Sequence, residues 1–157
     1  MSRDHHYHLD VKWDGPGKGL TTSYPTYSRE YVVEIAGKPP LRGTADPLFK
    51  GDPTLHNPEE WLVAALATCH MLSFLAQASR AGVSILAYND AAEGTMTIAH
   101  EGANFTNVTL HPRVTVPPGT DRALIEKLHE QAHASCFIAR SVNFPVEHEA
   151  IVSFAET

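Results

Sequence analysis

Two cysteines are the residues of this chain with the widest choice of chemistry. Cys69 lies in the middle of the apolar run 61–76, and Cys136 follows 67 positions later. The sequence has no CxxC pair and no paired Cys/His spacing of a zinc finger, which excludes the local metal-binding and thioredoxin motifs. A buried free cysteine behaves as a small apolar residue, so two inert core thiols are the alternative to a reactive pair.

Histidines accompany the first cysteine and the N-terminal region. His70 follows Cys69 directly, but neighbours in a helix point about 100° apart, so we do not expect His70 to act as a base for that thiol. We interpret it as a histidine of the core or of an interface. His5, His6 and His8 raise the question of a metal, but we expect side chains near a chain end to be solvated and predict no specific metal site there.

Motifs for bound cofactors are absent from the sequence. There is no GxGxxG or GxxxxGK[ST] loop for a nucleotide and no GxSxG element for a serine hydrolase. We therefore expect no cofactor. A metal held by Cys69, Cys136 and His133 is a weaker alternative, because thiolates and imidazole are the ligands that zinc prefers.

The composition predicts one globular domain, residues 1–157, with no nucleic-acid or membrane partner. The formal net charge is −6, and no basic stripe would attract nucleic acid or an anionic membrane surface. The first ten residues lack the apolar stretch of a signal peptide. The run 61–76 is interrupted by Thr68, His70 and Ser73 and is too short to cross a bilayer. We expect a cytoplasmic protein, in which a cysteine pair is more often catalytic, redox-active or metal-bound than a permanent disulfide.

A long helix must position Cys69. Asn57 is suited to the N-cap and Pro58 to the first helical position, while Arg80 with Gly82 beyond it predicts the end. Apolar residues cover nearly the whole circumference, which predicts burial on most sides. A small sheet cannot cover such a helix alone, so the excess of apolar surface predicts a second subunit.

Strands and a second helix complete the predicted fold. The stretch HYHLDVKW alternates apolar and polar residues, which predicts a half-buried strand, and 105–116 and 144–154 alternate as well. Segments 28–37 and 94–100 are also predicted as strands, and the proline- and glycine-rich segment 38–53 as a loop. An amphipathic helix opens at Asp121, with one apolar stripe at Ile125, Leu128, Ala132 and Cys136. This order indicates an α+β fold, an antiparallel sheet packed on a long buried central helix and a second helix. If the two helices pack together, the two thiols can meet.

The stretch NPEEWLVAALATCHMLSFLA resembles the active-site helix of the OsmC/Ohr superfamily, the osmotically inducible and organic-hydroperoxide-resistance proteins. The resemblance rests on the NPEE element that begins at Asn57, on Cys69 ten residues after Glu59, and on Cys136 at a helix end five residues before Ser141. The order of elements agrees over nearly the whole chain. The resemblance implies an OsmC-like fold and an intertwined homodimer.

A thiol peroxidase is the activity that this resemblance implies. The Cys69 thiolate would attack an organic hydroperoxide and become a sulfenic acid, which Cys136 would resolve as an intramolecular disulfide. A dithiol reductant, of lipoyl type in the family, would reopen it. Because burial raises a cysteine pKa and the helix dipole fades beyond the first turn, a mid-helix thiolate needs a cation. The family supplies an arginine, held by the glutamate of the NPE element, which here is Glu59.

The identity of that arginine is a choice among three cations. Arg29 in YSREYVV is the first choice, Arg42 in PPLRGT the second and Lys18 the third; each could instead be a solvated surface charge. In a straight helix, ten residues separate Glu59 from Cys69 by about 15 Å and about 280° of rotation. Either the helix breaks between them, or the Glu59–arginine pair serves Cys69 of a partner subunit, which predicts active sites at the interface of a homodimer.

Two questions of function are left open by the residues. An apolar pocket near the thiols would favour organic hydroperoxides, and the same side chains would equally suit a core: Leu62, Leu66, Met71, Phe74 and Phe137. The alternative function is a non-catalytic, OsmC-like ligand-binding or redox-sensing dimer, whose thiols oxidise but do not turn over.

Overall fold

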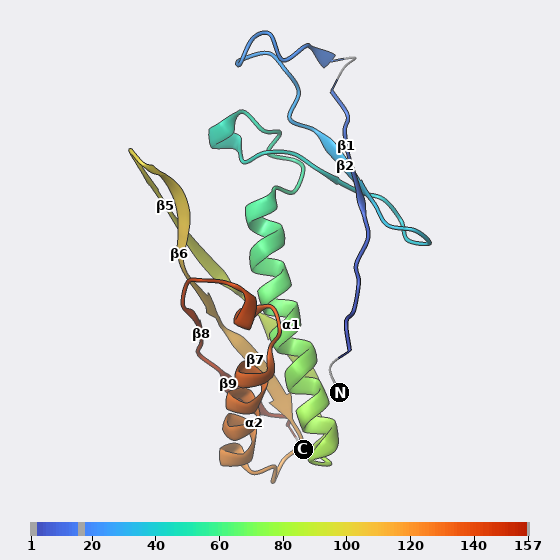
Figure 1. Ribbon diagram of the computed structural model, residues 1–157. Coiled ribbons are helices and arrows are strands. Elements are labelled where there is room, and N and C mark those ends of the chain that lie inside the picture. Colours follow the sequence, from blue (N-terminus) through green and yellow to red (C-terminus); the bar gives the residue numbers. More distant parts are fainter. Residues whose placement is uncertain (1–2, 16–17, 157) are drawn as a thin grey trace. The chain divides into compact units, whose positions relative to one another are not determined.

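The computed structural model describes residues 3–15 and 18–156, which fold as two compact units, Met1–Trp61 and Leu62–Thr157. The first unit carries a three-stranded antiparallel sheet in the order β1 (Asp10–Trp13), β2 (Tyr31–Glu34) and β3 (Leu41–Gly43) (Figure 1). Strand β3 lies in a segment that the sequence predicted to be a loop. Gly43 is required there, because a Cβ atom at this position would lie 2.3 Å from the Tyr31 ring.

The first predicted strand is shorter and more exposed than expected. Strand β1 begins at Asp10, and all four of its residues are exposed. The alternating apolar side chains of segment 7–13 are each more than 40% exposed: Tyr7, Leu9, Val11 and Trp13. The expectation of a half-buried strand was therefore wrong for the single chain. The alternation marks a face that an apolar partner could cover, and the described residues do not cover it.

Helix α1 (Pro58–Arg80) begins and ends where the sequence predicted. The Asn57 Oδ1 atom accepts a hydrogen bond of 2.8 Å from the backbone N–H of Glu60, and the Glu60 carboxylate accepts one of 3.3 Å from the N–H of Asn57. This reciprocal capping box satisfies two backbone donors that have no partner within the helix. At the other end, Gly82 has a φ of 68°, the left-handed conformation that suits a residue beyond a helix C-terminus.

Burial of α1 differs from the expectation. Only one stripe is buried, at the spacing of four that follows one helix face: Leu66, His70, Phe74 and Ala78. Burial on most sides was therefore wrong for the single chain, because the elements that pack on α1 cover one side of it. The 23-residue helix is also, contrary to expectation, long and apolar enough to span a bilayer. Core helices pass the same test of length and composition, so this finding alone does not indicate a membrane protein.

Two further sheets form the second unit. One has the order β4 (Ala87–Asp90), β7 (Pro112–Val116) and β9 (Ile151–Phe154), and the other the order β5 (Glu93–Ala99), β6 (Gly102–Leu110) and β8 (Val146–His148). The pairs β4–β7 and β5–β6 are antiparallel, but β6–β8 and β7–β9 are parallel. The α+β class is thus confirmed, while a purely antiparallel sheet is not.

Two of the segments predicted as single strands each form two strands in the structure. Segment 105–116 divides between β6 and β7 at His111, and segment 144–154 divides between β8 and β9. The N–H of His111 donates to the Asp90 carboxylate at 2.8 Å, and Pro112 has no N–H to donate. The hydrogen-bond ladder is therefore interrupted at this point, and the chain passes from one sheet to the next.

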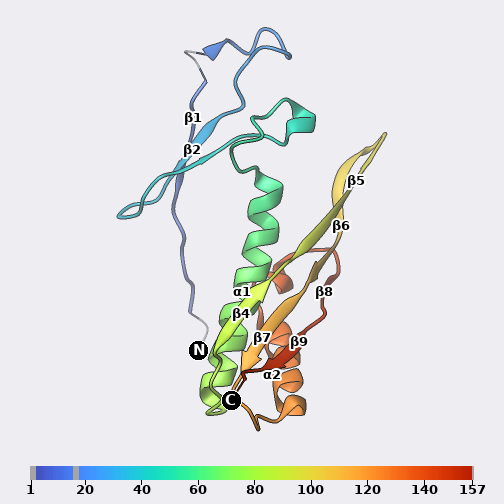
Figure 2. The ribbon, with the colours of Figure 1, turned by 180° about the vertical axis from the view of Figure 1, so that it is seen from behind.

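Helix α2 (Arg122–Ser135) packs into the core of the second unit as predicted. Its inward stripe is almost completely buried: Ile125, Leu128, Ala132 and, at the C-cap, Cys136. The stripe meets side chains from α1 and from the β4–β7–β9 sheet, including Phe74, Val114 and Val152. Figure 2 shows the ribbon of this sheet lying over both helices, and buried side chains of the sheet and of both helices pack in one cluster.

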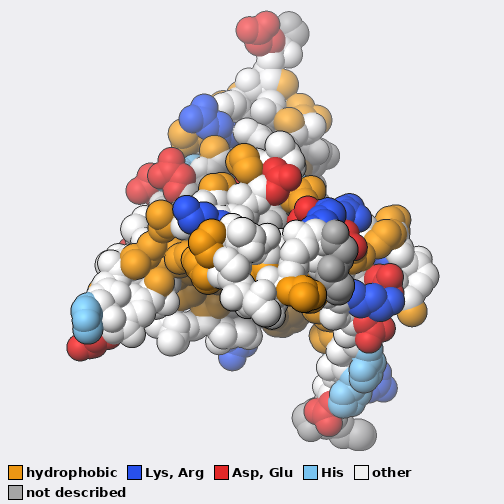
Figure 3. All heavy atoms as spheres, turned by 90° about the horizontal axis from the view of Figure 1, so that it is seen from above, with side chains coloured by type: hydrophobic (Ala, Val, Ile, Leu, Met, Phe, Trp, Pro, Cys, Tyr) orange, Lys and Arg blue, Asp and Glu red, His pale blue; other side chains and the backbone are white. Residues whose placement is uncertain are grey.

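Surface charge agrees with a protein that is weakly acidic overall. On the face seen in Figure 3, Lys and Arg side chains are mixed with Asp and Glu side chains and do not gather into one basic patch. Arg42 of β3 pairs with Asp14 and Glu30, which lie directly next to β1 and β2 in the chain.

Candidate active site

The two thiols come together at the junction of α1 and α2. Cys69 is partly exposed on α1, whereas Cys136 is 1% exposed at the C-cap of α2, and both are free. Burial raises the pKa of Cys136 to about 11, and a side-chain interaction with Cys69 contributes to that rise. The expectation that the packed helices would bring the thiols together is therefore confirmed. Cys136 is a neutral thiol at neutral pH, held beside a more accessible one.

A pocket of about 580 Å³ opens beside Cys69. Its lining comes from one face of α1 and from the residues around Cys136: Ala65, Thr68, Cys69, Leu72, Ser73, Ala76, Gln77, Arg80, Ser135, Phe137 and Ile138. The volume lies in the range of small-molecule sites. Apolar side chains line most of it, with Arg80 as the charged residue of the lining.

Most of the five side chains that the sequence offered for either a pocket or a core do not line this pocket. Of the five side chains named from the sequence, Phe137 is among the lining residues. Leu66 and Phe74 are fully buried in the core, on the α1 stripe that contains His70. The reason is helical rotation, because Cys69 lies one residue away from that stripe and so faces about 100° away from it.

Glu59 lies in the first turn of α1 and is partly buried. Its Oε2 atom is buried without a hydrogen-bond partner in the described chain. Burial raises the pKa of Tyr31, and the negative charge of Glu59 adds to the effect. Burial of a carboxylate oxygen without a hydrogen-bond partner costs free energy, so a cation that bound the Glu59 carboxylate would be stabilising.

Arg29 is held by tyrosines rather than by a carboxylate. Its guanidinium donates hydrogen bonds to the backbone carbonyls of Tyr24 and Tyr27, and its Cζ lies 3.7 Å from the centroid of the Tyr27 ring. The Arg29 Nε atom is buried without a partner. Among residues 3–15 and 18–156, no ion pair joins Arg29 to Glu59, so the structure does not bring these two predicted site residues together.

The other two candidate cations are engaged with carboxylates. Arg42 pairs with Asp14 at 2.7 Å and with Glu30 at 3.1 Å, and Lys18 pairs with Glu30 at 2.7 Å. Their charges are therefore already balanced at the surface. Arg29 differs in holding its charge against aromatic rings and carbonyl oxygens.

The course of α1 bears on one of the two geometries considered for Glu59 and Cys69, a break in the helix. The helix is continuous from Pro58 to Arg80 and contains both residues. A break between them is therefore excluded, and with it the simplest way for a Glu59-bound cation to reach Cys69 of the same chain.

A cluster of four histidines lies in the second unit and was missed by sequence reasoning. His70 on α1 and His129 on α2 are each 1% exposed, and the distance from His70 Nε2 to His129 Nδ1 is 3.1 Å. The ring of His148 on β8 lies 5.2 Å from the rings of both His70 and His133. Burial lowers the pKa of His70 to about 4 and that of His129 to about 3. The spacing of four between His129 and His133 was the available signal.

Metal binding gains no support from these arrangements. In the part of the chain that the structure describes, no group of three His, Cys, Asp or Glu side chains is arranged to hold a metal ion. This applies to the alternative of Cys69, Cys136 and His133. The rings of His6 and His8 stack at 6.5 Å on an exposed segment, and the absence of a specific site there stays a prediction.

Comparisons with known proteins find one matching family and similar proteins of uncharacterised function. The sequence model of a family described as OsmC-like protein matches residues 51–150. The chain is 33% identical to an OsmC-like protein of unknown function from Vibrio cholerae O1, whose structure superposes with a TM-score of 0.84 over 94% of this chain and 100% of the other. It is 26% identical to the uncharacterized protein YmaD of Bacillus subtilis, over 92% of this chain and 91% of that protein.

A more distant structure shares the fold alone. It is an organic hydroperoxide resistance protein OsmC from Legionella pneumophila, also described as a predicted redox protein. The two are 20% identical and superpose with a TM-score of 0.67, over 96% of this chain and 99% of the other.

Proposed function

The chain belongs to the OsmC-like protein family, and on that premise we propose that it is a thiol-dependent peroxidase that reduces organic hydroperoxides to alcohols. Cys69 is the peroxidatic residue and Cys136 the resolving residue. The observation that carries the proposal is the pairing of a thiol that lines a pocket with a buried thiol beside it. These are the two cysteines of the chain.

The proposed cycle uses both thiols in turn. The Cys69 thiolate attacks the hydroperoxide; an S–O bond forms, the O–O bond breaks, and the alkoxide takes up a proton and leaves as the alcohol. Cys69 is thereby oxidised by two electrons to a sulfenic acid. Cys136 then attacks that sulfur, and the S–S bond forms as the hydroxyl group and the thiol proton leave as water.

A dithiol reductant closes the cycle. By thiol–disulfide exchange it restores both cysteines and becomes a disulfide itself, and a lipoyl group belongs to this chemical class. Such a cycle needs a reducing compartment, which agrees with the prediction that the protein works in the cytoplasm. The pocket beside Cys69 supports an organic substrate, since its lining is mostly apolar.

The site is completed by a second copy of the chain in this proposal. Arg29 provides the cation and Glu59 holds it, but the continuous α1 favours their action on Cys69 of a partner subunit. Exposed apolar side chains support a homodimer: Leu72 is 63% exposed on α1 and Phe137 is 76% exposed beside Cys136. Surfaces of this kind indicate an interface in a stable protein.

Mass spectrometry of the reduced protein tests the proposal. After one equivalent of cumene hydroperoxide, we expect rapid formation of a Cys69–Cys136 disulfide. The Cys69→Ser variant should not react, and the Cys136→Ser variant should accumulate a sulfenic acid at Cys69. Slow or absent oxidation of both thiols would contradict the peroxidase.

The pocket also supports a second candidate function. In it the protein is a non-catalytic dimer that binds an apolar ligand, or a redox sensor whose thiols are oxidised but do not turn over. Its volume of about 580 Å³ is sufficient for such a ligand. Turnover separates the two functions. A peroxidase consumes many equivalents of hydroperoxide when dithiothreitol is supplied, whereas a sensor is oxidised once and stops.

A further inference from the structure

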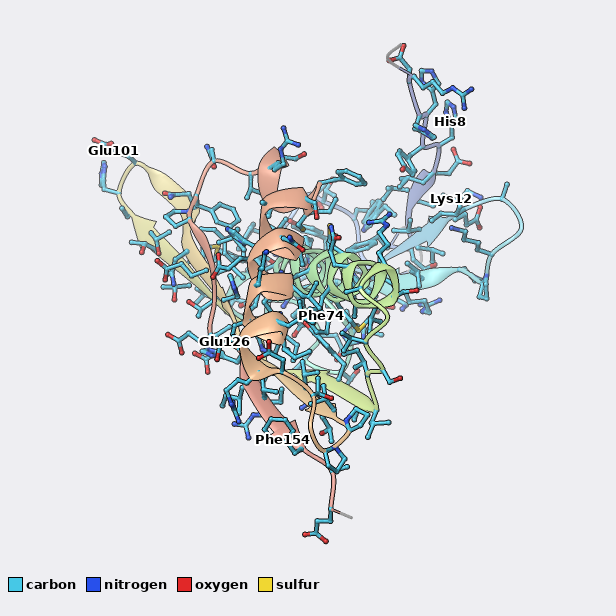
Figure 4. All side chains as sticks on the ribbon, turned by 90° about the horizontal axis from the view of Figure 1, so that it is seen from below. His8, Lys12, Phe74, Glu101, Glu126 and Phe154 are labelled. Atoms are coloured by element: carbon cyan, nitrogen blue, oxygen red, sulfur yellow. The ribbon has the colours of Figure 1, made fainter. Side chains whose placement is uncertain are left out.

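The histidine cluster joins the same two helices that carry the two cysteines. His70 follows Cys69 on α1, and His129 precedes Cys136 on α2 by two helical turns. The hydrogen bond between His70 Nε2 and His129 Nδ1, at 3.1 Å, is a buried polar contact between these helices. In Figure 4, Phe74 lies on the side of α1 that faces α2, and its ring stacks on His129 with centroids 4.0 Å apart.

A hydrogen bond at this place constrains the helices more than apolar contacts do. Apolar contacts are not directional, whereas a buried imidazole nitrogen that loses its partner is left desolvated without a hydrogen bond, which costs free energy. Sliding or rotation of α2 against α1 would separate His70 from His129 and leave both rings without a partner. The pair therefore favours one register of the two helices.

The rest of the cluster limits the ways in which that pair could rearrange. His148 on β8 approaches His70, and it lies 3.5 Å from the carboxylate of Glu130 on α2. His133 lies on α2, one turn before Cys136, and its ring centroid is 5.2 Å from that of His148. The outward nitrogens, His70 Nδ1 and His129 Nε2, are buried without partners, so the two rings offer each other the hydrogen bond available to them.

We propose that the His70–His129 hydrogen bond is a positioning device, which holds α1 and α2 in the register where Cys69 and Cys136 can form their disulfide. This rests on the proposed function for the use of that disulfide. The histidines act through the helices, and neither is proposed to touch the hydroperoxide. The effect is on the closing step, in which the Cys136 thiol attacks the Cys69 sulfenic acid and water leaves. In the test below, oxidised dithiothreitol instead takes the two electrons and two protons of the two thiols.

The test measures closure of the disulfide without any hydroperoxide. The full chain is equilibrated with mixtures of reduced and oxidised dithiothreitol, alkylated and analysed by mass spectrometry, which gives the equilibrium constant for the Cys69–Cys136 disulfide. Loss of the hydrogen bond in His129→Leu should lower that constant at least tenfold, about 30 mV in the two-electron potential. His129→Asn, whose amide can take the place of Nδ1, should stay within twofold of the unaltered chain.

A matched control separates positioning from general destabilisation. Val152→Ala removes buried apolar volume from β9 and leaves the His70–His129 hydrogen bond intact, and its constant should stay within twofold. Equal losses in Val152→Ala and His129→Leu would overturn the inference, as would equal losses in the leucine and asparagine variants. Failure of hydroperoxide to oxidise the chain, with this pattern intact, would instead refute the peroxidase alone.

A spectroscopic measurement on the unaltered chain covers the case in which His129→Leu does not fold. Long-range nitrogen NMR of the imidazoles should show one protonated and one unprotonated nitrogen for the pair His70 Nε2 and His129 Nδ1, with a slowly exchanging N–H proton. Absence of that proton would overturn the inference. So would one equivalent of bound zinc in the purified protein, because the nitrogens would then be metal ligands.

Discussion

Cys136 is buried beside Cys69, and the interaction between the two thiols helps to keep Cys136 protonated. Cys69 is the member of the pair that lines the pocket. This asymmetry separates their roles by access to the pocket and by the raised pKa of Cys136. A reagent in the pocket can reach Cys69, whereas Cys136 is placed to react with the oxidised form of Cys69.

Alkylation rates should follow that asymmetry. With iodoacetamide at pH 8, we expect Cys69 to react at least tenfold faster than Cys136, because a pKa of about 11 leaves Cys136 almost entirely as the unreactive thiol. Peptide mapping over time measures both rates. The same experiment in 6 M guanidinium chloride should equalise them, and equal rates in the folded chain would contradict the assignment.

Removal of the candidate cation should slow the first oxidation step. In Arg29→Gln, the rate at which hydroperoxide oxidises Cys69 should fall about 100-fold, in line with the loss of a charge that favours the thiolate. Stopped-flow fluorescence or quenched mass spectrometry measures the rate. Arg42→Gln is the matched control, since Arg42 is paired with Asp14 and Glu30, and it should leave the rate within threefold. The reverse pattern would move the role to Arg42.

A charge on the exposed face of α1 should break the proposed homodimer. We expect Leu72→Lys to shift the chain from dimer to monomer in sedimentation velocity, because a buried unpaired ammonium group is strongly unfavourable at an apolar interface. Leu48→Lys is the control: Leu48 is 64% exposed, against 63% for Leu72, and it lies outside α1. A monomeric unaltered chain would refute the interface.

Stability should decline in acid as the buried histidines gain protons. Burial lowers the pKa of His70 and His129 below the ordinary value of 6.5, so the unfolded chain binds more protons than the folded chain at pH 5. The free energy of unfolding therefore decreases as the pH falls from about 6.5 towards 4, by up to about 1.4 kcal/mol per pH unit for each histidine. Urea unfolding at several pH values measures this slope. His129→Asn should reduce it, and His100→Asn, at the exposed tip of the β5–β6 hairpin, should not.

Loss of the helix cap should cost stability without affecting the thiols. Asn57→Ala removes the side-chain acceptor of the Glu60 N–H and should lower the free energy of unfolding by about 1 kcal/mol. Asn57→Ser restores an acceptor and should recover most of the loss. Urea denaturation gives both values, and an alanine variant as stable as the unaltered chain would show that solvent replaces the cap.

Local features were readable from the sequence because they depend on neighbouring residues. Asn57 and Gly82 marked the ends of α1 through capping and left-handed backbone chemistry, which act within one turn. The inward stripe of α2 followed from helical periodicity alone. The strands were harder, because side chains keep alternating across the interruption at His111, while the choice of partner strand is set far away in the chain.

The sequence by itself determined the α+β class, the long helix with its caps and, through a family resemblance, the importance of Cys69 and Cys136. The tertiary structure alone decided that α1 buries one stripe, that burial raises the pKa of Cys136, and that His70, His129, His133 and His148 form one cluster around two buried rings. Backbone preferences and capping act over a few residues. Burial, pKa and side-chain partners depend on which distant segments pack together, and four histidines from three elements meet only when the chain has folded.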